Sequence, residues 1–264
     1  MDHVIQCGLS RAGTGAHPIP YYSLSECSQA SYQNCINEPK ARCRPSVESS
    51  AVMSYCAPLF QTNQFDWQDS DAITVIRNPV DRVWSMFRFE TNSCYKCMEL
   101  KDYYAHIDNG TVTGLYTSPD NAINCVAQLL NHQTRNLLTS PMSQDFTEED
   151  QTEEALYNLR NRFTVVGLTE QLPLTAQMIG YSFPWLAEKV EGSSSECGLP
   201  HANASPTNNY CGPDRTHWDL PPHPDEETTR IIEKHNLQDM KLYEAAVQHF
   251  ELQRRALGWG EETD

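Results

Sequence analysis

The sequence predicts a single α/β domain, and three observations lead to that prediction. The chain has 264 residues, which is enough for one large domain with a sizeable core. Residues 72–76 and 163–168 are short apolar runs of the kind found in buried strands. Each run is followed by a segment with the apolar spacing of a helix, residues 80–87 and 171–187.

The first of these segments contains a candidate phosphate-binding turn. Its apolar run ends at Asn78-Pro79, because proline removes a donor from the strand ladder. Pro79 suits the first turn of a helix, and Asp81 suits the positive N-terminal end of that helix. Arg77 should therefore leave the carboxyl end of a strand, with Ser85 two helical turns on. Ligands of open α/β sheets bind at that end, where an Arg and a hydroxyl can clamp a phosphate, although the pattern also fits an ordinary turn with a surface Arg and Ser.

Four helices are expected from apolar periodicity, over residues 80–105, 121–138, 155–162 and 226–258, in addition to the one at 171–187. The first of them should have an irregular end around Ser93 to Cys97. Within the last of the four, Asn236 and Asp239 should form a local capping turn between two helices and play no catalytic part. Glu170, directly after the second strand, either caps the helix that follows it or points into the site, and we expect the cap.

Charge and composition exclude several function classes. The net charge of −16 argues against non-specific nucleic-acid binding and against a basic membrane-surface role. It also disfavours a long polyanionic substrate, unless a local basic cleft opposes it. No stretch approaches the roughly 18 apolar residues of a membrane span, and the first residues lack the pattern of a signal peptide. We therefore expect either a cytosolic protein or a chain that lacks an N-terminal anchor. The acidic runs at 145–154, 225–227 and 261–264 should be solvated faces and helix N-termini.

The cysteine content favours an oxidising compartment. The count is even, and two N-glycosylation sequons, Asn109-Gly-Thr111 and Asn203-Ala-Ser205, point the same way, although sequons also arise by chance. The pair Cys94-x-x-Cys97 has no second pair at zinc spacing, so we expect a disulfide there, with Cys125 as a candidate partner, and no metal site. The ten cysteines are Cys7, Cys27, Cys35, Cys43, Cys56, Cys94, Cys97, Cys125, Cys197 and Cys211.

The turn at residues 76–85, IRNPVDRVWS, resembles the 3′-phosphate-binding motif of sulfotransferases that use 3′-phosphoadenosine 5′-phosphosulfate (PAPS). In particular it resembles the Golgi carbohydrate sulfotransferases, including the heparan sulfate 2-O type. Three further stretches resemble the family in the same order along the chain: NHQTRNL at 131–137, FTVVGLTE at 163–170 and IIEKHNLQDMKLYEAA at 231–246. The resemblance covers about residues 72–252, whereas residues 1–71 are divergent or truncated.

The resemblance implies one P-loop-like three-layer domain over residues 1–264, with a central parallel sheet flanked by helices. It implies transfer of a sulfuryl group from PAPS to a hydroxyl of a carbohydrate or glycan acceptor, in the Golgi lumen or secretory pathway. A membrane would be contacted only through an N-terminal anchor outside this chain. Arg77 and Ser85 would bind the 3′-phosphate. The stretch at 131–137 would lie near the cofactor or acceptor cleft without a defined chemical role, although it also fits a helix surface with an incidental Arg.

The family's loop for the 5′-phosphosulfate, Pro-Lys-x-Gly-Thr-Thr-Ser, resembles residues 10–16. Gly13 and Thr14 match and would contact the phosphosulfate. Arg11 replaces the Lys that stabilises charge on the leaving oxygen, and it presents that charge as a planar fork. Prolines at 18 and 20 disfavour the helix that follows this loop in the family. The alternatives are an unrelated N-terminal segment or a true loop lost upstream.

Two parts of the family's machinery are not identified. No His lies between His17 and His106, so the general base is unknown, and the nearby carboxylates of Glu48, Asp66 and Asp69 read as surface charges. Arg215, in the long polar stretch 189–227, is a weak candidate for the basic loop that closes over the cofactor. Two other functions therefore stay open: a non-catalytic protein of this fold that binds a 3′-phosphonucleotide or a glycan, and a secreted, disulfide-linked interaction protein.

Overall fold

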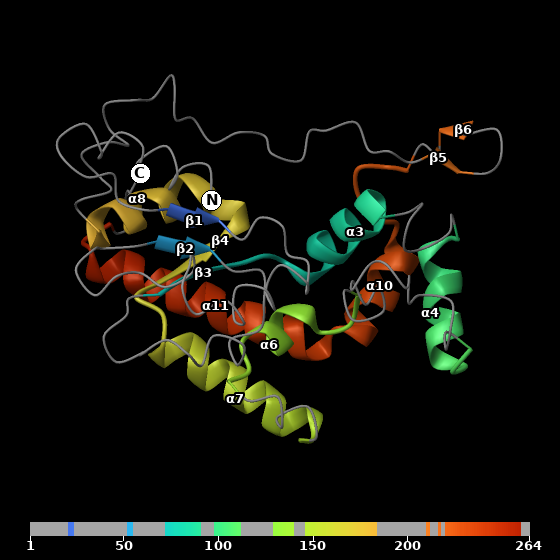
Figure 1. Cartoon of the computed structure of the whole chain (residues 1–264), viewed down its shortest axis with the longest axis horizontal. Coiled ribbons are helices and arrows are strands. Elements are labelled where there is room, and N and C mark those ends of the chain that lie inside the picture. Colours follow the sequence, from blue (N-terminus) through green and yellow to red (C-terminus); the bar gives the residue numbers. More distant parts are fainter. Residues whose placement is uncertain are drawn as a thin grey trace, which may run out of the picture. The chain divides into compact units, whose positions relative to one another are not determined.

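The computed structural model describes residues 21–23, 52–54, 72–90, 98–111, 129–139, 146–183, 210–211, 216–217 and 220–259 (Figure 1). The chain divides into two compact units, residues 1–57 with 172–205 and residues 58–171 with 206–264. In the first unit, β1 (Tyr21–Ser23) pairs in parallel with β2 (Val52–Ser54), and α8 spans Leu172–Ser182. The second unit contains the predicted phosphate-binding turn, so the description below concerns that unit.

A parallel strand pair forms as the sequence predicts. The strand β3 (Ile73–Ile76) pairs with β4 (Val165–Leu168), with Ile73 opposite Val165 and Ile76 opposite Leu168. All four residues of β4 are buried, as expected for a strand covered on both faces. Parallel strands need a long crossover, and here helices lie between them in the chain. The described residues are mostly helical, and the parallel pair agrees with an α/β class. A second, antiparallel pair joins β5 (Tyr210–Cys211) to β6 (Thr216–His217).

The helix after β3 starts where the sequence predicts but ends early. The helix α3 spans Pro79–Glu90, and the Asn78 side chain caps it by accepting from the Val80 N–H (2.9 Å). Its expected continuation to residue 105 is wrong, because Glu99 has an extended backbone and a separate helix, α4, spans Leu100–Asp108. Residues 91–97, which include the irregular end expected around Ser93 to Cys97, lie outside the described residues.

The helix expected over residues 121–138 is also wrong in its C-terminal part. Asn131 has a left-handed backbone (φ 44°), which interrupts a helix, and α6 contains only His132–Asn136. The two remaining predicted helices of this unit are confirmed, with different limits. The helix α7 spans Glu148–Asn161, and the C-terminal segment forms α10 (Glu226–His235) and α11 (Leu237–Ala256).

Acidic residues begin α7 and α10, as expected. Glu148, Glu149 and Asp150 occupy the first turn of α7, and its cap residue Thr147 accepts from the Asp150 N–H (3.2 Å). Asp225 caps α10 by accepting from the Thr228 N–H (2.7 Å). These charges complement the positive ends of the helix dipoles.

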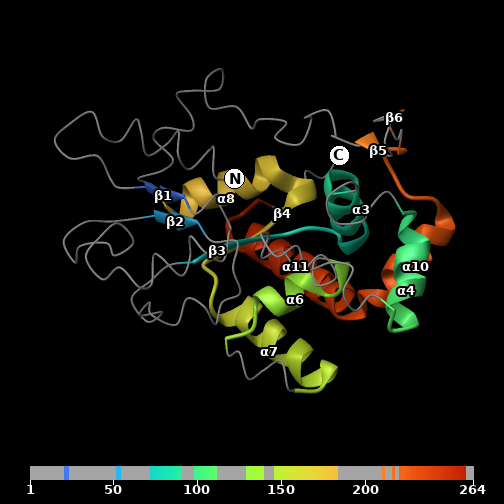
Figure 2. The same cartoon turned by 45° about the vertical axis from the view of Figure 1, so that its right-hand side comes forward.

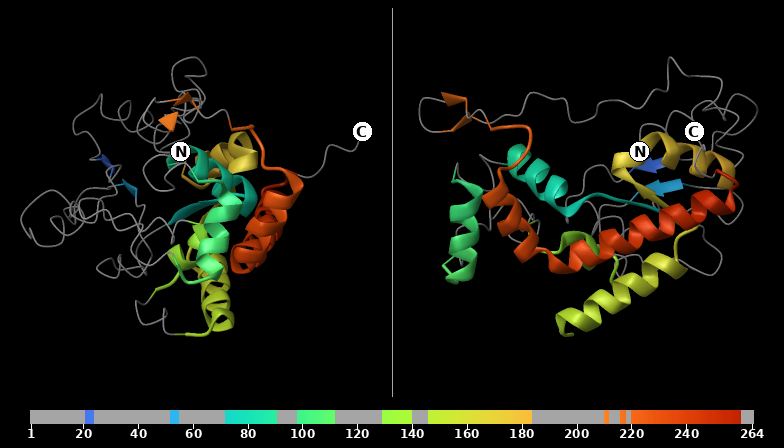
Figure 3. Two further views of the ribbon diagram at one scale, coloured as in Figure 1. Left: turned by 90° about the vertical axis from the view of Figure 1, so that its right-hand side faces the viewer. Right: turned by 180° about the vertical axis from the view of Figure 1, so that it is seen from behind.

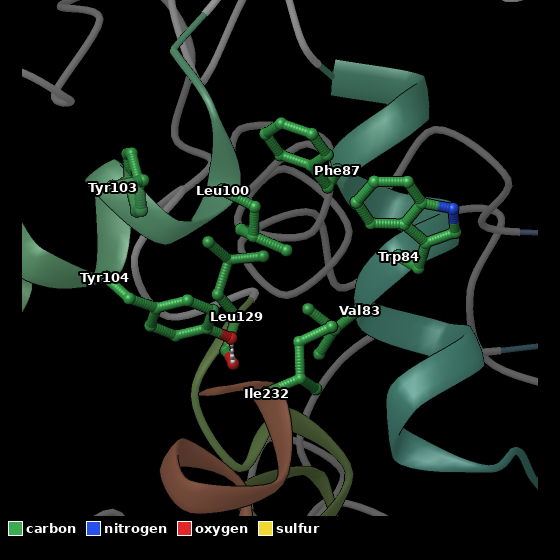
Figure 4. Close-up of a cluster of buried hydrophobic side chains, with 8 residues drawn as sticks. All are labelled: Val83, Trp84, Phe87, Leu100, Tyr103, Tyr104, Leu129 and Ile232. Carbon is green, nitrogen blue, oxygen red and sulfur yellow. Dashed lines mark hydrogen bonds between the residues drawn. The ribbon is translucent and has the colours of Figure 1, made fainter. Parts of the chain in front are cut away.

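A core cluster joins α3, α4 and α10 (Figure 4). Trp84 stacks on Phe87 with ring centroids 5.5 Å apart, and the Trp84 indole donates to the Pro221 carbonyl (3.1 Å). The Tyr104 hydroxyl donates to the Leu129 carbonyl (3.0 Å), which ties the segment before α6 to this cluster. Its buried members are Val83, Trp84, Phe87, Leu100, Tyr103, Tyr104, Leu129 and Ile232.

The helix α11 is the longest of the described helices, and several elements of the unit pack on it. It packs against α7, α6 and β4, and the views from the front and from behind show it running beside α7 (Figures 1 and 3). Gln253 fastens it to the second strand, since its side chain accepts from the Val166 N–H (3.1 Å) and donates to the Thr164 carbonyl (2.9 Å). At the other end of the unit, α4 lies beside α10 (Figure 2). No helix among the described residues is long and apolar enough to cross a membrane.

The stability of this unit should fall as the pH is lowered through the range of histidine titration. The His235 ring stacks on buried Tyr104 at 4.5 Å, and burial lowers the pKa of His235 below its ordinary value of 6.5, against the opposing effect of Asp108. His235 therefore takes up a proton at a higher pH in the unfolded chain than in the folded chain. As a result, this residue does not lower the free energy of unfolding above about pH 6.5, and it lowers that free energy progressively below this pH. Urea unfolding at a series of pH values measures the decline. His235→Phe keeps a ring on Tyr104 and should flatten the profile; an unchanged profile would contradict this account.

Candidate functional site

Arg77 and Ser85 lie where the sequence predicts them. Arg77 directly follows β3, and Ser85 is the seventh residue of α3. Because Val83 and Phe87 face the core, Ser85 lies on the opposite side of the helix. Both residues are half-buried, and neither the Arg77 guanidinium nor the Ser85 hydroxyl forms a hydrogen bond or ion pair with a described residue. Among the described residues, then, nothing occupies either group.

Gln133 holds the backbone of Arg77 at both of its polar groups. The Arg77 N–H donates to Gln133 Oε1 (2.9 Å), and Gln133 Nε2 donates to the Arg77 carbonyl (2.8 Å). Arg77 is the first residue beyond the strand pair, so its backbone groups would otherwise lack the partners that a ladder supplies. A single side-chain amide replaces the missing strand, which fixes the direction in which the chain leaves the sheet.

The other side of the turn is held from β4. Glu170 Oε1 accepts from the Asn78 N–H (2.8 Å), and Thr169 Oγ1 donates to the Ile76 carbonyl (3.3 Å). Glu170 and Thr169 lie in the 3₁₀ turn η4 (Thr169–Gln171), which follows β4 directly. We expected Glu170 to cap the helix after it; its observed bond is instead to the turn that begins α3. Burial first, and then the charge of Glu170 and its hydrogen bond, raise the pKa of Tyr243 in α11.

The N-terminus of α6 is capped by a carboxylate from α11. Fully buried Asp239 accepts from the backbone N–H of Gln133 (3.2 Å) and of Thr134 (2.8 Å), and from the Thr134 hydroxyl (2.8 Å). A helix of five residues is too short to be stable by itself in water. Asp239 therefore supplies both the cap of α6 and its attachment to α11.

The capping is reciprocal. Asn131, the residue before α6, places its Oδ1 within hydrogen-bond distance of the backbone N–H groups of Gln238 (3.1 Å) and Asp239 (3.2 Å), which begin α11. Its own N–H donates to Asn236 Oδ1 (2.9 Å), and Asn236 Nδ2 donates to the Ile232 carbonyl (2.9 Å). Asn236 thus sits between α10 and α11 as predicted, but Asp239 caps a distant helix instead of a local turn.

Two arginines surround the buried carboxylate of Asp239. Arg82 Nε lies 3.8 Å from Asp239 Oδ2, and only 12% of the Arg82 side chain is exposed. Burial lowers the pKa of Arg135, the charge of Asp239 opposes that shift, and the charge of Arg82 adds to it. A buried charge is tolerated when it is both paired and hydrogen-bonded, and Asp239 meets both conditions.

The polar stretch at 131–137 therefore has a definite structural role beside Arg77. Sequence reasoning placed it near the site without a chemical function, and it missed the pairing of Gln133 with Arg77 and of Glu170 with Asn78. Those partners are 56 and 92 residues apart in the chain, so no local pattern signals them. The four polar identities at fixed spacing were the only signal.

The other candidate residues lie outside the described residues: Arg11, Gly13, Thr14 and Arg215, together with the Cys94–Cys97 pair and the carboxylates of Glu48, Asp66 and Asp69. In the described part of the chain, no group of three or more His, Cys, Asp or Glu side chains is placed to hold a metal ion. The site that the structure assembles is thus the Arg77–Ser85 turn with its supports.

Removing the carboxylate of Asp239 should destabilise the second unit strongly. Asp239→Ala leaves the N-terminus of α6 uncapped and two arginines without their buried counter-charge, so we expect the free energy of unfolding to fall by about 3–5 kcal/mol. Urea denaturation followed by circular dichroism measures this. Glu244→Ala, at an exposed position of the same helix, is the matched control and should change the value by less than about 0.5 kcal/mol. Equal effects would show that the capping is energetically unimportant.

No family model matches the chain, and no curated protein sequence matches it. The function proposed below therefore depends on the residues of this chain, on their arrangement around Arg77, and on the sequence resemblance described above.

Proposed function

We propose that this protein is a sulfotransferase that moves a sulfuryl group from PAPS to a hydroxyl of a carbohydrate or glycan acceptor in the Golgi lumen or secretory pathway. The observation that carries the proposal is the segment from Arg77 to Ser85: an arginine at the carboxyl end of a parallel strand, and a hydroxyl on the outer side of the next helix. Neither the guanidinium nor the hydroxyl is hydrogen-bonded to a described residue, and Gln133 holds only the backbone of Arg77. On this proposal, β3 and β4 belong to the central sheet of a P-loop-like three-layer domain.

The chemistry of the turn suits the 3′-phosphate of the nucleotide. A guanidinium offers two parallel N–H donors that match two phosphate oxygens, and a serine hydroxyl supplies a further donor. The N-terminal end of α3 adds the partial positive charge of the helix dipole, while its Val80 and Asp81 N–H groups already donate to Asn78 Oδ1. These local contributions matter in a chain whose net charge of −16 repels a phosphorylated ligand at long range.

Gln133 and Glu170 support this role by fixing the backbone before any ligand binds. Each accepts from a backbone N–H of the turn, at Arg77 and Asn78 respectively. A turn that is already ordered loses little conformational entropy on binding, so more of the gross interaction energy remains as affinity. On this proposal, Gln133 acts through Arg77 and does not touch the nucleotide.

Sulfuryl transfer then needs charge neutralisation at the leaving group. The sulfur–oxygen bond to the 5′-phosphate breaks while the acceptor oxygen bonds to sulfur, and negative charge develops on the bridging oxygen that departs with adenosine 3′,5′-bisphosphate. In this proposal Arg11 stabilises that charge, and Gly13 and Thr14 cradle the phosphosulfate through backbone and hydroxyl donors. Arg215 would close over the cofactor. The residue that deprotonates the acceptor is unassigned.

Calorimetric titration with adenosine 3′,5′-bisphosphate tests the proposal. We expect saturable one-site binding, and much weaker binding of adenosine 5′-monophosphate, which lacks the 3′-phosphate. Arg77→Ala should weaken binding of the bisphosphate by about tenfold to a hundredfold, the value of a hydrogen bond to a charged group. Ser85→Ala should weaken it by about threefold to tenfold. Arg255→Ala, at an exposed position near the end of α11, removes the same charge elsewhere and should leave the affinity unchanged.

Two outcomes separate the alternatives. No binding of the bisphosphate by the wild-type chain would refute both cofactor-binding functions. It would leave a non-catalytic glycan-binding protein and the secreted interaction protein. Binding without transfer of labelled sulfate from PAPS to any glycan of a panel would favour the non-catalytic protein. That alternative draws its support from residues 10–16, where Arg11 replaces the family's lysine.

A further inference from the structure

The sequon Asn109-Gly110-Thr111 forms the end of α4, away from the residues of the proposed nucleotide site. All three of its residues are exposed. The Gly110 N–H donates to the Ile107 carbonyl (3.0 Å) and the Thr111 N–H donates to the His106 carbonyl (3.0 Å), which is the bond pair of a Schellman C-cap. Gly110 has the left-handed backbone that this cap requires (φ 65°). The sequon therefore occupies a defined, exposed turn.

The side chain of Asn109 is on the solvent side of its helix. The core-facing residues of α4 are Leu100, Tyr103 and Tyr104. At 3.6 residues per turn, nine positions from Leu100 to Asn109 amount to two and a half turns, so Asn109 faces the opposite way. Its carboxamide forms no hydrogen bond with any described residue. A large substituent on this nitrogen can therefore extend into solvent without displacing α3 or α10.

The carboxylate of the neighbouring residue, Asp108, does not contact the side-chain nitrogen of Asn109. The carboxylate of Asp108 is turned toward α10, where it accepts from Lys234 Nζ (3.0 Å) and lies 3.5 Å from His235 Nε2. The acidic side chain beside the sequon is thus held against the protein, and it does not compete for the amide of Asn109.

We propose that Asn109 carries an N-linked glycan when the chain passes through the secretory pathway. The co-reactant is an oligosaccharide on a lipid diphosphate. The amide nitrogen of Asn109 forms a bond to the anomeric carbon of the first sugar, the bond from that carbon to the diphosphate oxygen breaks, and the lipid diphosphate leaves with the electron pair. The amide nitrogen gives up one proton to the transferring enzyme.

The structure also indicates at which stage of folding the glycan is added. The Thr111 hydroxyl, which defines the acceptor sequence, donates to the His106 carbonyl (3.2 Å) and lies 2.8 Å from His106 Nδ1. In the folded chain this hydroxyl is therefore engaged by α4. Transfer takes place before the end of α4 closes, on the chain as it enters the lumen, and the glycan remains compatible with the fold because Asn109 faces solvent.

The test expresses the full chain behind a cleavable secretion signal in cultured animal cells, with a known acceptor sequon appended at its C-terminus. The glycan on that appended sequon marks chains that have entered the lumen, and peptide mass spectrometry after enzymatic deglycosylation reads the occupancy of Asn109 in those chains alone. We expect most of them to carry a glycan at Asn109. Asn109→Gln and Thr111→Ala should abolish it, whereas Thr111→Ser should retain it because the hydroxyl is kept. Asn203→Gln, in the other sequon, is the matched control and should leave Asn109 occupied.

An unmodified Asn109 in wild-type chains whose appended sequon is glycosylated would overturn the proposal. So would retention of the glycan in Thr111→Ala. The inference shares the secretory localisation of the proposed function but does not depend on nucleotide binding. If Asn109 is not glycosylated but the protein still binds the bisphosphate, the glycosylation proposal is wrong and the proposed binding of the nucleotide by Arg77 and Ser85 is unaffected.

Discussion

The carboxylate of Asp239 lies at the junction on which the rest of the described site depends. It accepts hydrogen bonds that begin α6, while Asn131, at the start of α6, accepts those that begin α11. Each helix thus receives its cap from the other, and neither contact survives if the two separate. The short helix α6 in turn carries Gln133, whose amide holds the backbone of Arg77. The position of Arg77, the candidate phosphate-binding residue, therefore depends on the buried carboxylate of Asp239, which acts through α6.

This arrangement explains why several polar side chains are buried beside the β3–β4 pair. A buried carboxylate costs free energy unless it is paired and hydrogen-bonded, and here three hydrogen bonds and the Arg82 guanidinium offset that cost. As a result, the backbone of the turn is held by hydrogen bonds from two directions, from Gln133 and from Glu170. Preorganisation of this kind is what a small anionic ligand needs in a protein whose overall charge is strongly negative.

The sequence predicted the strand, the turn and the start of α3, because proline and the change of apolar period are local signals. The limits of the helices were missed where the deciding feature is not periodic: the extended backbone of Glu99 before α4, and the left-handed Asn131 within the expected helix 121–138. The supports of the turn could not be predicted, because Gln133 and Glu170 reach Arg77 and Asn78 through tertiary contacts, and Asp239 acts through α6. Polar identities at fixed spacing indicated that the stretch 131–137 matters, but not which groups it contacts.

The central claim is that the Arg77–Ser85 turn holds the 3′-phosphate of a nucleotide. Phosphorus-31 nuclear magnetic resonance of adenosine 3′,5′-bisphosphate tests it directly, because the two phosphates give separate signals. Our account predicts that the 3′-phosphate signal shifts or broadens when wild-type protein is added, and that Arg77→Ala restores it toward its free position. A 3′-phosphate signal that responds equally to wild type and Arg77→Ala, or to neither, would contradict the account.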